Sequence, residues 1–311
     1  MPLTFSGNLD RLQTEQVQRD SHAQWGEDKQ PEERLSDLFD LIDTFGEAAL
    51  HLEGLIDRSA TVLSSLKRYT YRIATPGLSR SLAAVGLGAV FTHPDHRGCG
   101  YAPTLIHKTL EKARNEGFDM ALLFSDITPA FYEKCGFMAI PAETAWIALS
   151  AVPQAPPLLT RPAAPRDLSR LLSWYESSWS DDWIRVQRQR ETWDLMLRIN
   201  AHPSLLILSD GADELGYVAV REHSDGSLWM DEYCVPHPYR SSLSSRVLAT
   251  VATLAKNATR IGTWLRPGDD RQGFCTEVRT EAVPMLAVLH PDISLLRSPS
   301  DKVFFSPLDH V

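Results

Sequence analysis

The sequence is poor in cysteine, and its cysteines are not placed for a disulfide framework or a metal site. Four occur in 311 residues, with no C-x-x-C pair and no histidines at zinc-ligand spacing. A disulfide-stapled secreted domain and a zinc-binding module both need cysteines in closer, regular sets. We therefore predict no metal, and we expect a reducing, cytoplasmic compartment.

Long apolar runs and an excess of positive charge are also absent. No run approaches the roughly 20 apolar residues that a membrane-spanning helix needs, and residues 1–30 have no apolar core of a signal peptide. Lysine and arginine total 31 against 40 acidic residues, a net charge of −9. Such a balance disfavours nucleic-acid binding. We expect neither a membrane nor a nucleic acid as partner.

The phosphate-binding motifs of common nucleotide enzymes are missing as well. Neither G-x-x-x-x-G-K-[ST] nor G-x-G-x-x-G occurs, which counts against P-loop and dinucleotide-binding folds. The chain nevertheless carries a glycine-containing loop of its own. An uncharged run from Leu82 to Phe91, interrupted by Gly86 and Gly88, predicts a buried strand that something approaches closely.

A loop and an amphipathic helix follow this strand without a gap. Arg97, Gly98 and Gly100 supply a cation and two positions without a side chain, and Pro103 is tolerated in the first helical turn. Backbone N–H groups that converge at a helix N-terminus form an anion site. The residues thus predict a strand, a phosphate-type loop and a helix in succession.

Two segments resemble one family. Arg97-x-x-Gly100-x-Ala102 is similar to the R/Q-x-x-G-x-G/A signature of the GNAT superfamily of N-acetyltransferases, and residues 131–137, FYEKCGF, resemble its F-Y-x-x-x-G-F segment. The resemblance implies an α/β (α+β) fold with a mixed, mostly antiparallel sheet flanked by helices. It also implies an acetyl-CoA-dependent N-acetyltransferase that moves the acetyl group to a primary amine.

The resemblance implies roles for individual residues. The N–H groups of the loop would bind the pyrophosphate of coenzyme A, and the end of the preceding strand would bind its pantetheine arm. Tyr132 would be the general acid that protonates the departing thiolate. The expected cofactor-binding residues are Val90, Phe91, Thr92, Arg97, Gly98, Cys99, Gly100, Tyr101 and Ala102.

The general base stays open, because the strand from Leu82 to Phe91 contains no carboxylate. An alkyl ammonium group of pKa about 10.4 must lose a proton before it attacks. Four groups are candidates: His51, Glu53, Asp126 and the carboxylate of Val311. The apolar C-terminal segment predicts a docked terminus, and a terminal carboxylate at the active site occurs in the enhanced-intracellular-survival branch of the superfamily.

The second half of the chain repeats the pattern of the first. His237 to Leu243 and the following helix echo His93 to Cys99 and its helix, but without glycine. We therefore expect two tandem GNAT-like domains, the second one degenerate. The predicted divisions are a polar N-terminal arm (1–33), a catalytic domain (34–150), a proline-rich linker (151–160) and a degenerate domain with a C-terminal extension (161–311).

Composition leaves several matters open. The acceptor is either a small-molecule amine or a protein amine, and the oligomeric state is not predicted. The main alternative to an enzyme is a non-catalytic, acyl-CoA-binding regulatory module. An intact loop together with Tyr132 favours the enzyme.

Overall fold

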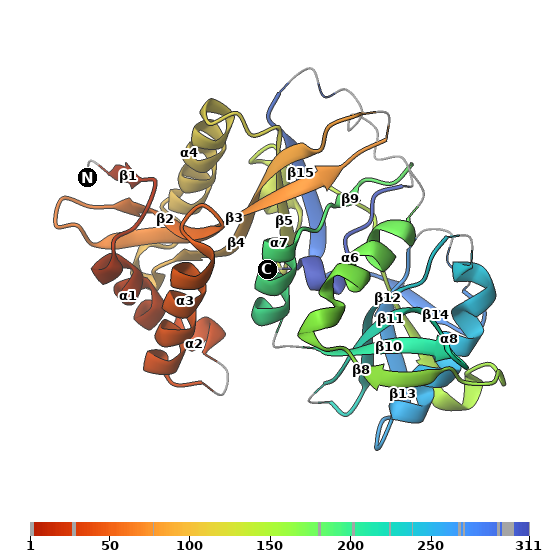
Figure 1. Cartoon of the computed structure of the whole chain (residues 1–311). Helices are drawn as coiled ribbons and strands as arrows, with labels where there is room; N and C mark the ends of the chain where they lie inside the picture. The colour runs from red at the N-terminus through yellow and green to blue at the C-terminus, as the bar shows by residue number, and fades with distance from the viewer. Residues whose placement is uncertain are drawn as a thin grey trace.

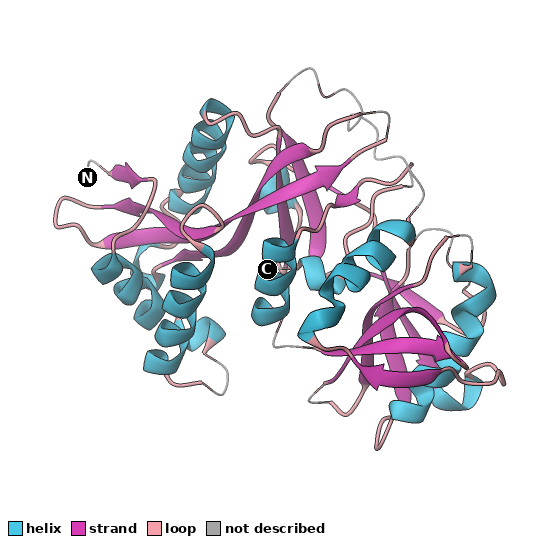
Figure 2. Cartoon of the chain, viewed as in Figure 1, coloured by secondary structure: helices cyan, strands magenta, loops and turns pink. Residues whose placement is uncertain are grey.

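The chain folds around two β-sheets (Figures 1 and 2). The computed structural model describes residues 3–26, 29–76, 78–179, 182–200, 203–223, 225–237, 239–266, 269, 271–290, 293 and 302–310. The first sheet has the order β1 (Thr4–Ser6), β2 (Leu50–Ile56), β3 (Val62–Ala74), β4 (Leu82–Thr92), β5 (Met120–Ser125), β15 (Val283–Val288), β6 (Met138–Ala139), and β9 (Arg185–Val186) pairs with β3.

The second sheet runs through strands from both halves of the chain. Its order is β14 (Cys275–Val278), β7 (Glu143–Ala148), β13 (Arg260–Trp264), β12 (Leu228–Cys234), β11 (Asp213–Glu222), β10 (Ser204–Asp210), β8 (Leu159–Pro162). The paired strands are antiparallel except β4 with β5 in the first sheet and β12 with β13 in the second. The predicted class, mostly antiparallel mixed sheets flanked by helices, is confirmed.

Helices cover both faces of the first sheet (Figure 1). The helices of the chain are α1 (Arg11–Asp20), α2 (His22–Trp25), α3 (Pro31–Phe45), α4 (Tyr101–Asn115), α5 (Ala130–Glu133), α6 (Leu168–Ser177), α7 (Arg190–Ile199) and α8 (Arg240–Leu254). Side chains alternate along β5, so Leu123 packs in the core beneath α4, whereas Leu122 and Phe124 pack in the core on the opposite face. We call these the α4 face and the α1 face.

One parallel pair in each sheet is joined through a helix. The first crossover is β4–α4–β5 and the second is β12–α8–β13. Parallel neighbours need such a connection because a short turn cannot join their ends. The predicted strand, loop and helix over residues 82–115 are the first part of this unit.

The predicted N-terminal arm is wrong. Residues 4–6 pair with β2, and Asp10 caps α1 in a capping box with Gln13. Leu9 and Val17 are buried in the α1-face core. The sequence concealed this helix because it is short and polar, and even its inward-facing residues include Gln18.

The halves of the chain exchange strands. Strand β7, which falls inside the predicted catalytic domain (34–150), lies in the second sheet, paired with β13 and β14. In return, β15 from the second half lies between β5 and β6. Leu159 and Thr160, assigned to the linker, begin β8, which continues through Arg161 into the predicted second domain. A strand's choice of partner is a long-range contact that its own residues do not encode.

The C-terminal segment docks, as predicted for the apolar ending. A buried turn at Pro307–Asp309 is held by Arg188, which donates to Asp309 Oδ1 at 2.9 Å and to both oxygens of Glu232 at 2.6 and 2.9 Å. Asn200 Nδ2 donates to the backbone oxygens of Leu308 and His310. Val311, the proposed source of a catalytic carboxylate, lies outside the described residues.

The helices are too short or too polar for membrane insertion wherever the structure is described, so no candidate span is found there. In the same part of the chain no three metal-ligating side chains come together.

Candidate active site

Strands β4 and β5 separate within the first sheet. They pair from Ala84 to Leu87 and from Met120 to Leu123, and no pairing follows. At this point β4 bulges against β3: the register shifts between Ser65 and Lys67, and Ala89 has a φ of 46°. A bulge bends its strand and frees backbone groups from the ladder. The opening between the two strands therefore offers main-chain donors and acceptors to an extended ligand.

The glycine loop, residues 97–102, begins α4 at the edge of this opening. Gly98 and Gly100 have φ values of 79° and 77°, a region that side chains rarely adopt, and open space surrounds both. Within the described chain, nothing accepts a hydrogen bond from the N–H groups of residues 98–102. These donors and the helix dipole make an unfilled anion site, with the exposed Arg97 beside it.

Tyr132 lies on α5 with its ring enclosed by aromatic neighbours. Its ring centroid is 4.9 Å from that of Phe131 and 6.2 Å from that of Phe137, both edge-on. Burial first, and the negative charge of Asp126 second, raise the pKa of Tyr132 to about 12. The phenol is therefore protonated at every physiological pH and can act as a donor.

His310 approaches β5 from the α1 face, and its importance was not predicted. Its ring centroid lies 5.0 Å from that of Phe124 and 6.4 Å from that of Trp264. Burial lowers the pKa of His310 below its usual 6.5, against the pull of the Asp126 carboxylate. The imidazole is neutral at neutral pH and can accept a proton. No local motif marks such a residue; its place next to the end of the chain was the one available signal.

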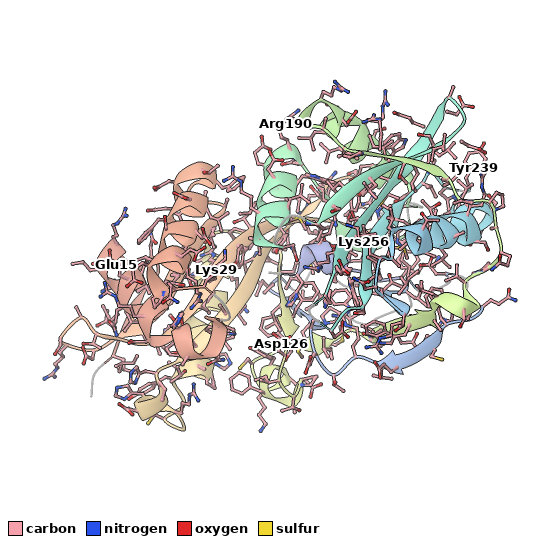
Figure 3. All side chains as sticks on the ribbon, turned by 90° about the horizontal axis from the view of Figure 1, so that it is seen from below. Glu15, Lys29, Asp126, Arg190, Tyr239 and Lys256 are labelled. Atoms are coloured by element: carbon pink, nitrogen blue, oxygen red, sulfur yellow. The ribbon has the colours of Figure 1, made fainter. Side chains whose placement is uncertain are left out.

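Asp126 links the two sides of this strand end. Its Oδ1 accepts a hydrogen bond from the Ala282 N–H at 2.9 Å, and its charge acts on both Tyr132 and His310. Figure 3 shows Asp126 between the N-terminal helices and the second half of the molecule. The proposed acid and the neutral histidine are thus grouped around the open end of β5.

Glu53 is not available as a base. It is fully buried, and it accepts hydrogen bonds from Arg68 at 2.9 Å, Lys112 at 2.8 Å and Thr109 at 2.5 Å. Burial raises the pKa of Glu53, but the hydrogen bond with His51 and those with Lys112, Thr109 and Arg68 outweigh it and lower the pKa to about 2. His51 is tied to Glu53 and to the Glu47 carbonyl oxygen. Both candidates belong to a structural ion-pair network at the edge of the sheet.

Lys67 is a second feature that the sequence did not reveal. It pairs with Gly88 across the ladder next to the bulge, and with Ala89 and Trp25 it lines a small cavity of about 10 Å³. Burial and the nearby Arg34 charge lower the pKa of Lys67 to about 8. The lysine brings a cation to the bulge without an acidic partner among the described side chains.

The second crossover has a different interior. Its helix begins after Tyr239, which has an ordinary φ of −69°, and Arg240 donates to Asp269 twice at 3.0 Å and to the Tyr233 carbonyl oxygen at 2.7 Å. A cavity lined by this pair is about 10 Å³, room for about one water. Side chains therefore fill the space that is open in the first crossover.

Residues 23–140 match a family model described as an acetyltransferase (GNAT) domain. No curated protein matches the chain in sequence.

Several solved structures share the fold over nearly the whole chain. A probable N-acyltransferase from Enterococcus faecalis V583 is 13% identical, with a TM-score of 0.73, covering 93% of this chain and 73% of that one. A GCN5-related N-acetyltransferase from Kribbella flavida is 19% identical (TM-score 0.67, 93% and 72%), and Eis1 from Mycobacterium abscessus is 17% identical (TM-score 0.62, 93% and 74%). At these identities the likeness shows the fold alone.

Proposed function

From the premise that residues 23–140 are a GNAT acetyltransferase domain in a chain with the tandem-GNAT fold, we propose that the protein transfers an acetyl group from acetyl-CoA to a primary amine. One observation carries the proposal: an unfilled anion site at α4 lies beside two separated strands, whereas in the second crossover the space beyond the last β12–β13 pair, at Met230, holds the Arg240–Asp269 ion pair and a cavity of only about 10 Å³.

The donor binds along the first crossover in this proposal. The N–H groups of Gly98 to Ala102 and the Arg97 guanidinium hold the pyrophosphate. The pantetheine arm lies between β4 and β5 against Val90, Phe91 and Thr92. A backbone N–H at the bulge polarises the thioester carbonyl as negative charge develops on its oxygen, and the nearby Lys67 cation favours the same charge.

Tyr132 acts when the thiolate leaves. The amine nitrogen forms a bond to the carbonyl carbon, the carbon–sulfur bond breaks, and the phenol O–H gives its proton to the sulfur; solvent then returns a proton to Tyr132. A phenol of pKa about 12 is a weak acid for an aqueous thiolate of pKa about 8.5. The thiolate is released into the same desolvated site. Desolvation also raises the pKa of the thiol, so the difference between the pKa values of the phenol and the thiol becomes smaller.

The C-terminal tail supplies the base. His310 is neutral and lies on the side of β5 opposite Tyr132, so a proton can leave the amine on one side while another reaches the sulfur on the other. The carboxylate of Val311, one residue further, is the second group that we propose for this role.

The test is release of free coenzyme A thiol with a broad amine panel, together with calorimetric titration of acetyl-CoA. The expected result is one donor site per chain and amine-dependent thiol release. Tight binding at one site without thiol release from any amine would instead favour the alternative, a non-catalytic acyl-CoA-binding regulatory module.

A further inference from the structure

Arg279 is a buried arginine with one edge unused. Its side chain is 7% exposed, and its Cζ atom lies 3.3 Å from the centroid of the Trp264 ring. Neither Nε nor Nη2 has a hydrogen-bond partner among the described residues. These two N–H groups point along the same edge of the planar guanidinium, the edge that binds both oxygens of a carboxylate at once.

The residue lines a cavity of about 320 Å³ between the two sheets. Its walls are mainly apolar, from Ile140, Pro284, Val303 and Phe305. Arg271, on the rim, is already paired with Glu143 at 2.5 Å. The volume suits a small organic molecule, and Arg279 is the cation in its wall that is left without a hydrogen-bonded anion in the described chain.

The cavity adjoins the open end of β5. The Trp264 ring that carries Arg279 lies 6.3 Å from Phe124 of β5, which also contacts His310. Asp126 acts electrostatically on Arg279, Tyr132 and His310 alike. Asp126 is exposed and does not hydrogen-bond Arg279, so it does not occupy the free edge of the guanidinium.

We infer that the acceptor is an amine that also carries a carboxylate on an apolar body, bound with the carboxylate on the Nε and Nη2 edge of Arg279. This inference rests on the proposed acetyl transfer. Burying a guanidinium without an anion is costly, and a ligand carboxylate removes that cost. The site should therefore prefer acceptors with a carboxylate over acceptors that carry an amide or a bare alkyl chain, because the latter two leave the arginine unpaired.

Binding is tested first, without turnover. Calorimetry compares N-acetylated ω-amino acids of four, six and eight carbons, which are the products of the reaction, with their terminal amides. We expect at least one acid to bind about tenfold more tightly than its amide, and we expect Arg279→Gln to abolish this preference. Arg271→Gln, in the same cavity wall but already paired, should keep it.

Turnover measurements then test whether the bound carboxylate belongs to the acceptor or to the acyl donor. With acetyl-CoA, the free ω-amino acids should have KM values about tenfold below those of their amides, and Arg279→Gln should equalise them. Succinyl-CoA with a simple alkylamine is the second arm. Suppose that Arg279 lowers the KM for succinyl-CoA relative to acetyl-CoA but does not lower the KM for the amino acids relative to their amides. The carboxylate would then belong to the donor, and the inference would be overturned.

Stability gives a readout independent of activity. Since no hydrogen-bond partner lies at the free edge of Arg279 among the described residues, Arg279→Gln should leave the unliganded Tm unchanged or raised, whereas a structural arginine would lower it. No acid preferred over its amide in the wild type would overturn the inference while leaving acetyl transfer intact. Acid binding with no thiol release from any amine would instead sink the proposed function.

Discussion

The two crossovers have the same strand–helix–strand order and opposite interiors. In the first, Gly98 and Gly100 hold a loop of free N–H groups beside separated strands. In the second, Arg240 and Asp269 form a largely buried ion pair, with side chains 13% and 11% exposed, in the corresponding space. Figure 3 places Tyr239, at the start of α8, far across the molecule from Asp126.

The difference lies in a few side chains. An anion site at a helix start needs N–H groups without side chains in front of them. A buried arginine supplies its own anion and closes the space. The same strand–helix–strand topology can therefore bind a ligand or be filled by side chains. The residues at the start of the helix determine which of these occurs.

The largest effect should come from a side chain in the glycine loop. Gly100→Val puts a β-branched residue at a φ of 77° and covers the N–H groups, so the Kd for acetyl-CoA should rise about 100-fold or more. Gly211→Val is the control, since Gly211 has a φ of 62° in open space in the second half. Calorimetry measures both; unchanged donor binding in Gly100→Val would mean that the loop is not the donor site.

Tyr132→Phe should lower kcat about 100-fold while leaving donor affinity within about twofold, because only the leaving thiolate uses the hydroxyl. Tyr233→Phe, in the second crossover, is the matched control and should keep wild-type kcat. With a pKa of about 12 for Tyr132, wild-type kcat should show no decline from this group up to about pH 10. An unaltered kcat in Tyr132→Phe would show that the Tyr132 hydroxyl has no role in the mechanism.

His310→Phe keeps the aromatic packing and should lower kcat/KM about tenfold if the imidazole is the base; extending the chain beyond Val311, which moves the terminal carboxylate away while keeping His310, tests that carboxylate separately. Because the pKa of His310 is lowered, its neutral form persists below pH 6.5, and the acid decline of kcat/KM should begin below that value. Between the lowered pKa and 6.5 the unfolded chain binds more protons, so stability should fall as pH falls through this window. A variant with the wild-type profile would exclude His310.

The smallest effect on turnover is expected in the second crossover. Arg240→Met removes the counterion of Asp269. The free energy of unfolding, measured by urea titration, should therefore fall by about 3 kcal/mol. Donor stoichiometry should stay at one per chain and kcat within about twofold. Arg246→Met, which breaks an exposed pair with Asp210, should change stability much less. A second acetyl-CoA bound by Arg240→Met would show that one side chain alone closes the site.

The strand and the helix of the first crossover could be predicted from local sequence signals. The strand predicted over residues 82–91 is β4 at Leu82–Thr92, and the helix predicted after the glycine loop is α4. Uncharged residues, paired glycines and an apolar stripe act over a few positions, so they can be recognised without the fold. The same reasoning failed for α1, whose buried face is largely polar.

The glycine loop, its helix and the segment bearing Tyr132 can be identified from the sequence, because glycine backbone freedom and helical periodicity are properties of neighbouring residues. The sheet to which β7 and β15 belong, and the gathering of His310, Asp126 and Arg279 at one strand end, follow from the folded chain. Those residues are far apart in the chain. Their chemistry depends on burial and on charges contributed by other elements, which exist only once the chain has folded.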